Sequence, residues 1–257
     1  MHGPAQADKS DTPTRNGMHM TQETTISLTD LANVAGSDKG TTHPYPHHYT
    51  RIYDMLLQPH RHSLKRMMEI GLMAGGPEVG GDADRVVRTA PSVDMWLKFF
   101  PNAEVTGFDI SDFSWMDHPR FTFVRGDSGI EADLERAAAQ GPFDLIIDDG
   151  SHASFHQQLA FKVLFPKLRP GGLYIIEDLQ WQSPFYEDDL PATHKTSDVI
   201  DNWFKTGAFP EFTPPELEGL QSLGQDIAFA TVFNQPFSEG TVIPKMAVIH
   251  KHLAPST

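Results

Sequence analysis

A strand–helix–strand pattern in which both strands end in acidic residues leaves this chain few possible folds. Residues 145–152 read Leu-Ile-Ile-Asp-Asp-Gly-Ser-His, and residues 173–178 read Leu-Tyr-Ile-Ile-Glu-Asp. Apolar residues at helical spacing over 155–165, followed by a turn at Arg169–Gly172, predict a helix between them. Parallel strands joined by a helix form a right-handed crossover. We therefore expect both acidic clusters at the carboxyl edge of one sheet, where open α/β folds bind ligands.

The remainder of the chain continues this alternation of strands and helices. The pattern predicts further strands at 66–70, 104–109 and 121–124, helices at 95–100, 130–139 and 199–204, and late strands at 227–233 and 246–250. A short helix is expected to begin near Asp30, with Asp30 as its cap. The sequence predicts a doubly wound, mostly parallel α/β sheet of seven strands with an antiparallel hairpin at one edge.

Composition narrows the class of ligand. The 257 residues carry a formal net charge of −14 and no cysteine. These values argue against a disulfide framework, a thiolate site and binding to nucleic acid. No apolar run reaches the length of a membrane span and no signal pattern opens the chain, so a cytoplasmic protein with a small-molecule substrate is expected.

The two acidic clusters predict a metal site with a neighbouring base. Adjacent strands lie about 5 Å apart, so Asp149, Glu177 and Asp178 can converge on one cation. Carboxylates this close repel one another unless they are neutralised. Hard oxygen ligands without sulfur favour magnesium or calcium over zinc. His152 faces the same space and is suited to accept a proton near pH 7.

The earlier strand ends predict a second ligand group. Gly71 permits a sharp turn that brings backbone N–H groups near a ligand, and Asp109 ends a strand where a ribose diol can be bound. Asp127 and Ser128 end the third strand and could contact an adenine, or could instead cap the following helix.

Taken together, these motifs resemble class I S-adenosylmethionine-dependent methyltransferases. The likeness is narrower to the metal-dependent sugar O-methyltransferases of macrolide biosynthesis, and covers roughly residues 29–180. It rests on Glu69-Ile70-Gly71, Asp109, Gly126-Asp127-Ser128, residues 148–152 and residues 170–178, with a similar Ser37-Asp38-Lys39-Gly40 lead-in. The resemblance implies a Rossmann-like methyltransferase fold.

The resemblance also implies roles for individual residues and an organisation of the chain. Magnesium would be held by Asp149, Glu177 and Asp178, with His152 as the base. S-adenosylmethionine would be bound by a set of residues from the earlier motifs: Glu69, Gly71, Ser92, Asp109, Asp127, Ser128 and Asp148. Residues 23–62 would be a substrate-side lead-in and 63–257 the catalytic domain. Residues 1–22 are expected to be disordered for a different reason, because they are polar, carry proline and glycine, and show no periodicity. The acceptor would be a sugar with vicinal hydroxyls on a natural product, and the enzyme could form a homo-oligomer.

One departure from the family pattern and several alternatives remain. The segment 72–91 is inserted between the glycine turn and the Ser92-Val93-Asp94-Met95-Trp96 helix, and a mobile loop is expected there. A metal-dependent hydroxylase resembling cephalosporin hydroxylase could use the same sheet and acids. A nicotinamide-dependent oxidoreductase is disfavoured because residues 71–76 lack the compact glycine spacing. A binding module without turnover is the third alternative.

Overall fold

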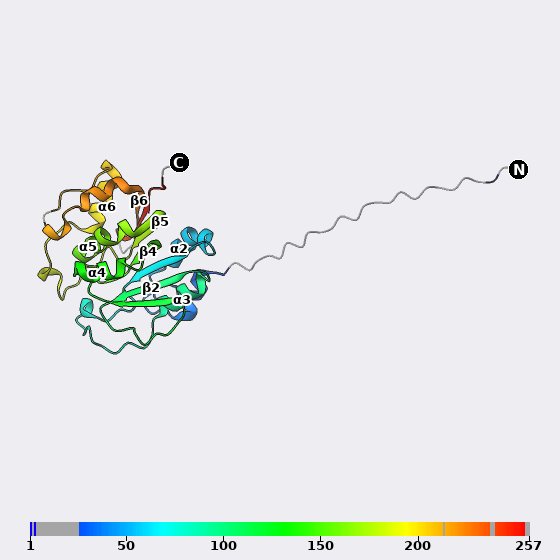
Figure 1. Cartoon of the computed structure of the whole chain (residues 1–257), viewed down its shortest axis with the longest axis horizontal. Coiled ribbons are helices and arrows are strands. Elements are labelled where there is room, and N and C mark those ends of the chain that lie inside the picture. Colours follow the sequence, from blue (N-terminus) through cyan, green and yellow to red (C-terminus); the bar gives the residue numbers. More distant parts are fainter. Residues whose placement is uncertain (2, 4–25, 213, 237–239, 255–257) are drawn as a thin grey trace.

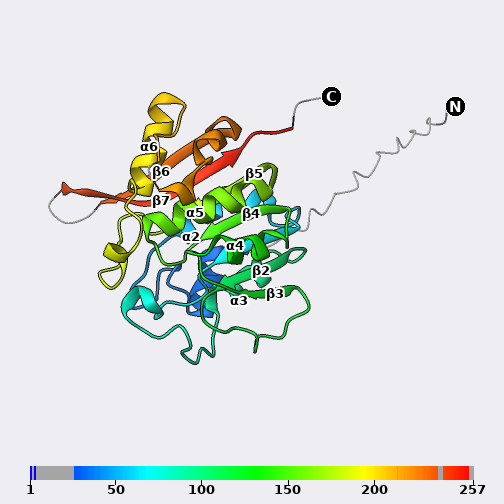
Figure 2. The same cartoon turned by 60° about the vertical axis from the view of Figure 1, so that its left-hand side comes forward.

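The computed structural model describes residues 1, 3, 26–212, 214–236 and 240–254. The predicted disordered segment 1–22 lies almost wholly outside these residues. A single seven-stranded sheet has the order β3-β2-β1-β4-β5-β7-β6, and Figures 1 and 2 show it running through the whole domain. Strands β1 to β5 are parallel, whereas β7 is antiparallel to both β5 and β6. The predicted fold class is confirmed, including the antiparallel pair at the sheet edge.

The elements follow one another largely as the sequence predicts. The strands are β1 Arg66–Ile70, β2 Glu104–Asp109, β3 Phe121–Arg125, β4 Phe143–Asp148, β5 Leu168–Ile176, β6 Ile227–Pro236 and β7 Val242–Lys251. The α-helices are α1 Leu28–Ala35, α2 Thr50–Leu57, α3 Pro91–Phe99, α4 Glu131–Ala138, α5 Ser154–Leu164 and α6 Thr196–Thr206.

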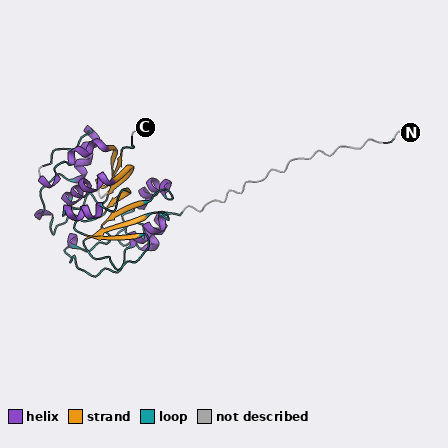
Figure 3. Ribbon diagram, viewed as in Figure 1, coloured by secondary structure: helices purple, strands orange, loops and turns teal. Residues whose placement is uncertain are grey.

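Helices cover both faces of the sheet, as Figure 3 shows. Neighbouring strand residues point to opposite faces, so Met67 and Met68 enter different cores. Met68 packs in the core beneath α4, α5 and α6, and Met67 packs with Trp96 and Tyr53 beneath α1, α2 and α3. The lead-in helices α1 and α2 therefore bury their apolar residues in the same core as the sheet.

Three local expectations are corrected. Helix α1 is capped by Ser27, whose Oγ accepts from the Asp30 amide at 3.2 Å, because Ser27 has the extended backbone of a cap. Asp127 and Ser128 do not cap α4, since Ile130 occupies that position without a side-chain hydrogen bond. The turn expected at 169–172 is an irregular stretch within β5, where Gly171 has φ +79° and the register with β4 shifts.

None of the helices in the described part of the chain is long and apolar enough to cross a membrane.

Candidate active site

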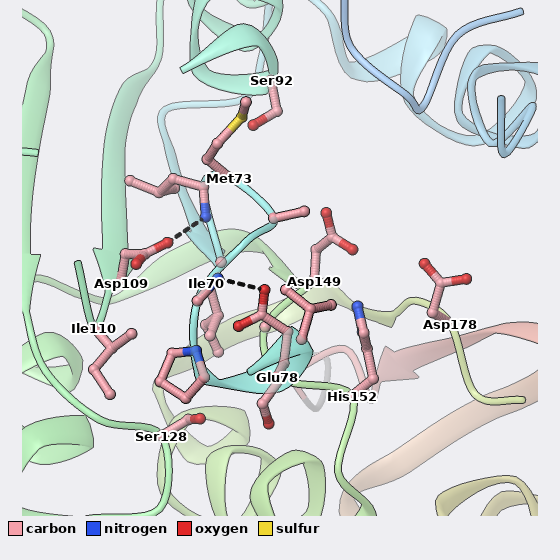
Figure 4. Close-up of a pocket in the computed structure, with 18 of the residues that line it drawn as sticks. Ile70, Met73, Glu78, Ser92, Asp109, Ile110, Ser128, Asp149, His152 and Asp178 are labelled. Atoms are coloured by element: carbon pink, nitrogen blue, oxygen red, sulfur yellow. Dashed lines mark hydrogen bonds between the residues drawn. The ribbon is translucent and has the colours of Figure 1, made fainter. Parts of the chain in front are cut away.

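A cavity of about 930 Å³ opens at the carboxyl ends of the parallel strands. Eight of the eleven residues predicted for the site line it: Gly71, Ser92, Asp109, Asp127, Ser128, Asp149, His152 and Asp178. Figure 4 shows Asp109 and Ser128 on one side of this pocket and Asp149, His152 and Asp178 on the other. The remaining three, Glu69, Asp148 and Glu177, are buried behind its wall.

Gly71 makes the close approach between the ends of β1 and β4 possible. Its φ is +77°, in the left-handed region that favours glycine. A Cβ at this position would lie 2.0 Å from the carbonyl oxygen of Asp149 and 2.7 Å from the Cα of Gly150. Only a residue without a side chain therefore allows the loop that carries Asp149 to pass this close to β1.

Asp109 is fixed by the loop that follows β1. Its two carboxylate oxygens accept hydrogen bonds from the amides of Leu72 at 2.8 Å and Ser111 at 2.7 Å. Burial raises the pKa of Asp109, although the two amide bonds oppose the shift. Asp127 accepts from the Gly129 amide at 2.8 Å, which shapes the turn that places Ser128 in the wall. These strand ends form a polar rim suited to a nucleoside.

Glu69 is buried behind this rim, and its hydrogen bonds are to other residues of the protein. Its carboxylate accepts from Ser92 Oγ at 2.8 Å and from the indole N–H of Trp96 at 3.0 Å. Burial raises its pKa to about 7, opposed chiefly by the charge of Lys39. In this structure Glu69 positions Ser92, which does reach the cavity.

Asp149, His152 and Asp178 form the group able to hold a cation. Among the described residues, each offers a ligand atom, and these atoms lie within 4.8 Å of one another. His152 has φ 63° and Asp178 has φ 50°, both uncommon for residues with a side chain. Such conformations concentrate at functional sites. No described group forms a hydrogen bond to the buried atom His152 Nδ1.

Glu177 and Asp148 do not reach this group. Both Glu177 oxygens accept from Lys39 Nζ at 2.9 Å, and Oε1 also accepts from the Tyr53 hydroxyl. Asp148 accepts weakly from the Gly150 amide at 3.3 Å, and burial raises its pKa to about 7. Asp149 nevertheless shares the Lys39 ammonium with Glu177, so the two carboxylates are close.

The lead-in supplies partners for the acids that the sequence motifs did not indicate. Lys39 binds Asp149 and Glu177, the Tyr49 hydroxyl donates to Asp178 at 2.8 Å, and His47 Nδ1 lies 3.1 Å from Asp178. Lys245 Nζ of β7 also lies 2.5 Å from Asp178. Although burial raises the pKa of Asp178, the His47 contact and neighbouring positive charges hold it well below its ordinary value.

The inserted segment 72–91 folds over the pocket. It contains one 3-10 turn, η2 Pro77–Val79, from which Glu78 points into the cavity in Figure 4. Glu78 Oε1 accepts from the amides of Gly75 and Gly76 at 2.7 and 2.8 Å. Ser183 Oγ donates to the Glu78 carbonyl oxygen at 2.7 Å and fastens the segment to the loop after β5. The insertion thus forms part of the pocket wall.

Comparison with known proteins supports the resemblance drawn from the motifs. The chain is 42% identical over 137 residues to mycinamicin VI 2''-O-methyltransferase of Micromonospora griseorubida, covering 52% of this chain and 32% of the relative. It is 40% identical over 171 residues to a tetracenomycin-C rhamnosyl 2'-O-methyltransferase of Streptomyces olivaceus, covering 63% of this chain and 41% of the relative. Over that part of its length the chain is similar to these O-methyltransferases. The chain spans about a third to two fifths of the length of these relatives. No family model matches the chain.

The fold agrees with this relationship. MycE methyltransferase from the mycinamycin biosynthetic pathway, solved in complex with Mg and SAH, matches with a TM-score of 0.63 and 26% identity. The match covers 89% of this chain and 55% of MycE. A second MycE structure, which also contains mycinamycin VI, gives a TM-score of 0.62 and 27% identity.

Proposed function

We propose that the chain is a magnesium-dependent O-methyltransferase that transfers a methyl group from S-adenosylmethionine to a sugar hydroxyl of a natural product. The observation that carries this proposal is one pocket with a nucleoside-type rim at Asp109 and a cation-type cluster at Asp149, His152 and Asp178. By their names, its relatives methylate the 2''-oxygen of mycinamicin VI and the 2'-oxygen of a rhamnosyl tetracenomycin-C.

The residues present fit a hard divalent cation. Asp149 and Asp178 each offer a carboxylate oxygen, within 4.8 Å of each other, and the Lys39 ammonium already lies between Asp149 and Glu177. Magnesium prefers oxygen ligands to imidazole. Asp149, Glu177 and Asp178 would therefore be its ligands. Glu177 would have to give up one of its hydrogen bonds to Lys39 or Tyr53. His152 would remain free to accept a proton.

The residues also fit the methyl donor. Asp109 would accept from the ribose hydroxyls, while Asp127 and Ser128 would flank the base and Ser92 the amino-acid end. Glu69 and Asp148 would act on the donor only through the walls of the pocket, because both are buried behind it. The sulfonium donor supplies an activated methyl group, and the metal supplies a Lewis acid that binds the acceptor oxygens.

His152 would carry the proton-transfer step. The acceptor oxygen forms a bond to the methyl carbon, the carbon–sulfur bond breaks, and its electron pair remains on sulfur as a thioether. The hydroxyl proton passes to an imidazole nitrogen of His152. Trp181 packs edge-on against this ring at 5.5 Å between centroids and fixes its orientation. His43, Tyr45 and His47 line the acceptor side of the cavity.

The test is methyl transfer to sugar-bearing natural products with labelled S-adenosylmethionine, followed by mass analysis of the product. We expect a product heavier by one methyl group, loss of turnover with a chelator and recovery with Mg²⁺. A product that gains an oxygen atom, or turnover indifferent to chelation and Mg²⁺, would contradict the proposal.

A substitution at His152 tests the base. We expect His152→Ala to retain binding of S-adenosylhomocysteine while turnover falls about 10²-fold or more. The control is His252→Ala, an exposed residue just beyond the end of β7. Equal turnover in the two variants would remove His152 from the proton transfer.

A further inference from the structure

Lys39 is a deeply buried cation beside the proposed metal site. Its side chain is 1% exposed, and Nζ lies 2.5 Å from Asp149 Oδ2 and 2.9 Å from each Glu177 oxygen. Glu69 Oε1 is 3.7 Å away. The ammonium of Lys39 therefore contacts two carboxylates and approaches a third.

The backbone around Lys39 is anchored on both sides. Its carbonyl oxygen accepts from the Thr50 amide at 3.0 Å, at the start of α2, and its amide donates to Ser37 Oγ at 3.3 Å. A buried lysine whose main chain is held by two elements has little freedom to move. Its ammonium is therefore placed by the fold of the lead-in.

The ammonium approaches the acids from the protein interior. Glu177 is fully buried, whereas the Asp149 side chain is 20% exposed and lines the cavity. Lys39 binds Asp149 through Oδ2. This contact occupies one carboxylate oxygen of Asp149 and leaves the other to a ligand in the cavity.

We propose that Lys39 is a positioning residue that holds Asp149 and Glu177 together from behind, so that both can serve a divalent cation on the pocket side once one Glu177 oxygen has been released from the ammonium. This inference rests on the metal site proposed above. Groups that orient metal ligands through hydrogen bonds are worth about 10- to 100-fold in metal affinity. The Tyr53 hydroxyl, which also donates to Glu177, acts in the same sense from α2.

Charge and positioning predict opposite effects when Lys39 is removed. If Lys39 were only a counter-ion, its loss would leave a more negative site and tighten cation binding, because like charges repel. If Lys39 orients the ligands, its loss leaves two buried carboxylates free to repel each other and move apart. The sign of the change in metal affinity therefore separates the two roles.

The experiment measures Mn²⁺ binding by water-proton relaxation, with Mg²⁺ as competitor, in the full chain without other ligands. Mn²⁺ shares the preference of Mg²⁺ for oxygen ligands. We expect Lys39→Met to bind Mn²⁺ about 10- to 100-fold more weakly than the wild type. Lys162→Met is the matched control. Lys162, in the last turn of α5, also pairs with a glutamate, Glu131 of α4, but it does not contact the proposed metal ligands. Unchanged or tighter binding by Lys39→Met would overturn the inference.

Two further measurements keep the result interpretable. If Lys39→Met does not fold, Lys39→Arg keeps the buried charge but not the compact ammonium, and about tenfold weaker Mn²⁺ binding is expected. Wild-type affinity in that variant would then overturn the inference. Absence of Mn²⁺ binding to the wild type, or binding unaffected by Asp149→Asn, would instead refute the metal site itself.

Discussion

Replacement of Gly71 by alanine should disrupt the junction on which the pocket depends. The added Cβ would lie 2.0 Å from the Asp149 carbonyl oxygen, 2.6 Å from its carbonyl carbon and 2.7 Å from the Gly150 Cα. All three neighbours are backbone atoms, which cannot rotate aside as a side chain can. Ordinary contact begins at 3.4 Å, so the loop after β4 would have to recede by about 1.4 Å.

The expected cost has two parts. A non-glycine residue in the left-handed conformation costs about 1–2 kcal/mol, and forcing an atom into a packed region costs about 1–3 kcal/mol more. Gly207→Ala is the matched control, since Gly207 has φ +74° but a Cβ added there would meet no described atom within 4 Å. We expect Gly207→Ala to show only the first part, and Gly71→Ala to lose about 3 kcal/mol or more in total.

Urea unfolding at constant pH gives the free energies of unfolding of both variants, and calorimetric titration gives their affinity for S-adenosylhomocysteine. Gly71→Ala should lose affinity because the recession of Asp149 and Gly150 deforms the pocket wall, whereas Gly207→Ala should bind normally. If the two variants are equally stable and bind equally well, the close approach of β1 and β4 does not determine the site.

Two further predictions concern buried acids. The pKa of Glu69, raised by burial to about 7, lies above its unfolded value, so its contribution to stability is present at low pH and lost as pH rises through 7. Between pH 6 and 8 this contribution should fall by about 1.4 kcal/mol. Urea unfolding of the wild type should show the fall, and that of Glu69→Gln should not. Equal pH dependence of the wild type and Glu69→Gln would contradict the prediction. Asp109→Ala should weaken S-adenosylhomocysteine binding at least about tenfold, because the proposed carboxylate bond to the ribose would be lost. The control is Asp112→Ala, which removes a carboxylate bond to the Ser114 amide on an exposed loop; equal affinities of the two variants would exclude Asp109 from the cofactor site.

The sheet and the edge on which the site lies could be predicted because they depend on local pattern. Apolar strands ending in acids, separated by one helix, allow few topologies once right-handed crossovers are required. That rule alone placed Asp109 and Asp149 at one edge, and the structure agrees. The inserted segment 72–91 could be recognised as a departure, but not its path, because a loop without periodicity carries no signal for where it packs.

The orientation of the individual acidic side chains at the strand ends could not be predicted from the sequence. Glu177 and Asp178 are adjacent, and alternation along a strand would send their side chains to opposite sides. Strand β5 ends at Ile176, before both acids; the left-handed backbone of Asp178 turns its carboxylate toward His152, whereas Glu177 stays within the core. Nothing in the sequence marks that change of conformation, because aspartate tolerates it without a distinctive neighbour.

The pairing of Lys39 with Asp149 was equally hidden, since 110 residues separate them along the chain. Charge balance is the signal that could have found it. Three carboxylates on neighbouring strand ends demand positive charge or proton donors close by, and the lead-in concentrates lysine, histidine and tyrosine in residues 39–53. An acidic cluster at a sheet edge therefore predicts where a polar, aromatic lead-in will dock, even when no local pattern connects the two.

The backbone conformations of His152 and Asp178 bear on the role of His152. Its left-handed backbone and that of Asp178 each cost about 1–3 kcal/mol unless the surroundings impose them. Here the two conformations bring an imidazole and a carboxylate within 4.8 Å of Asp149. An imidazole nitrogen bound to a cation cannot take up a proton, so a histidine that served as a ligand would be lost as a base through that atom. In the proposed ligand set, which uses only carboxylate oxygens of Asp149, Glu177 and Asp178, His152 would remain free to act on the substrate.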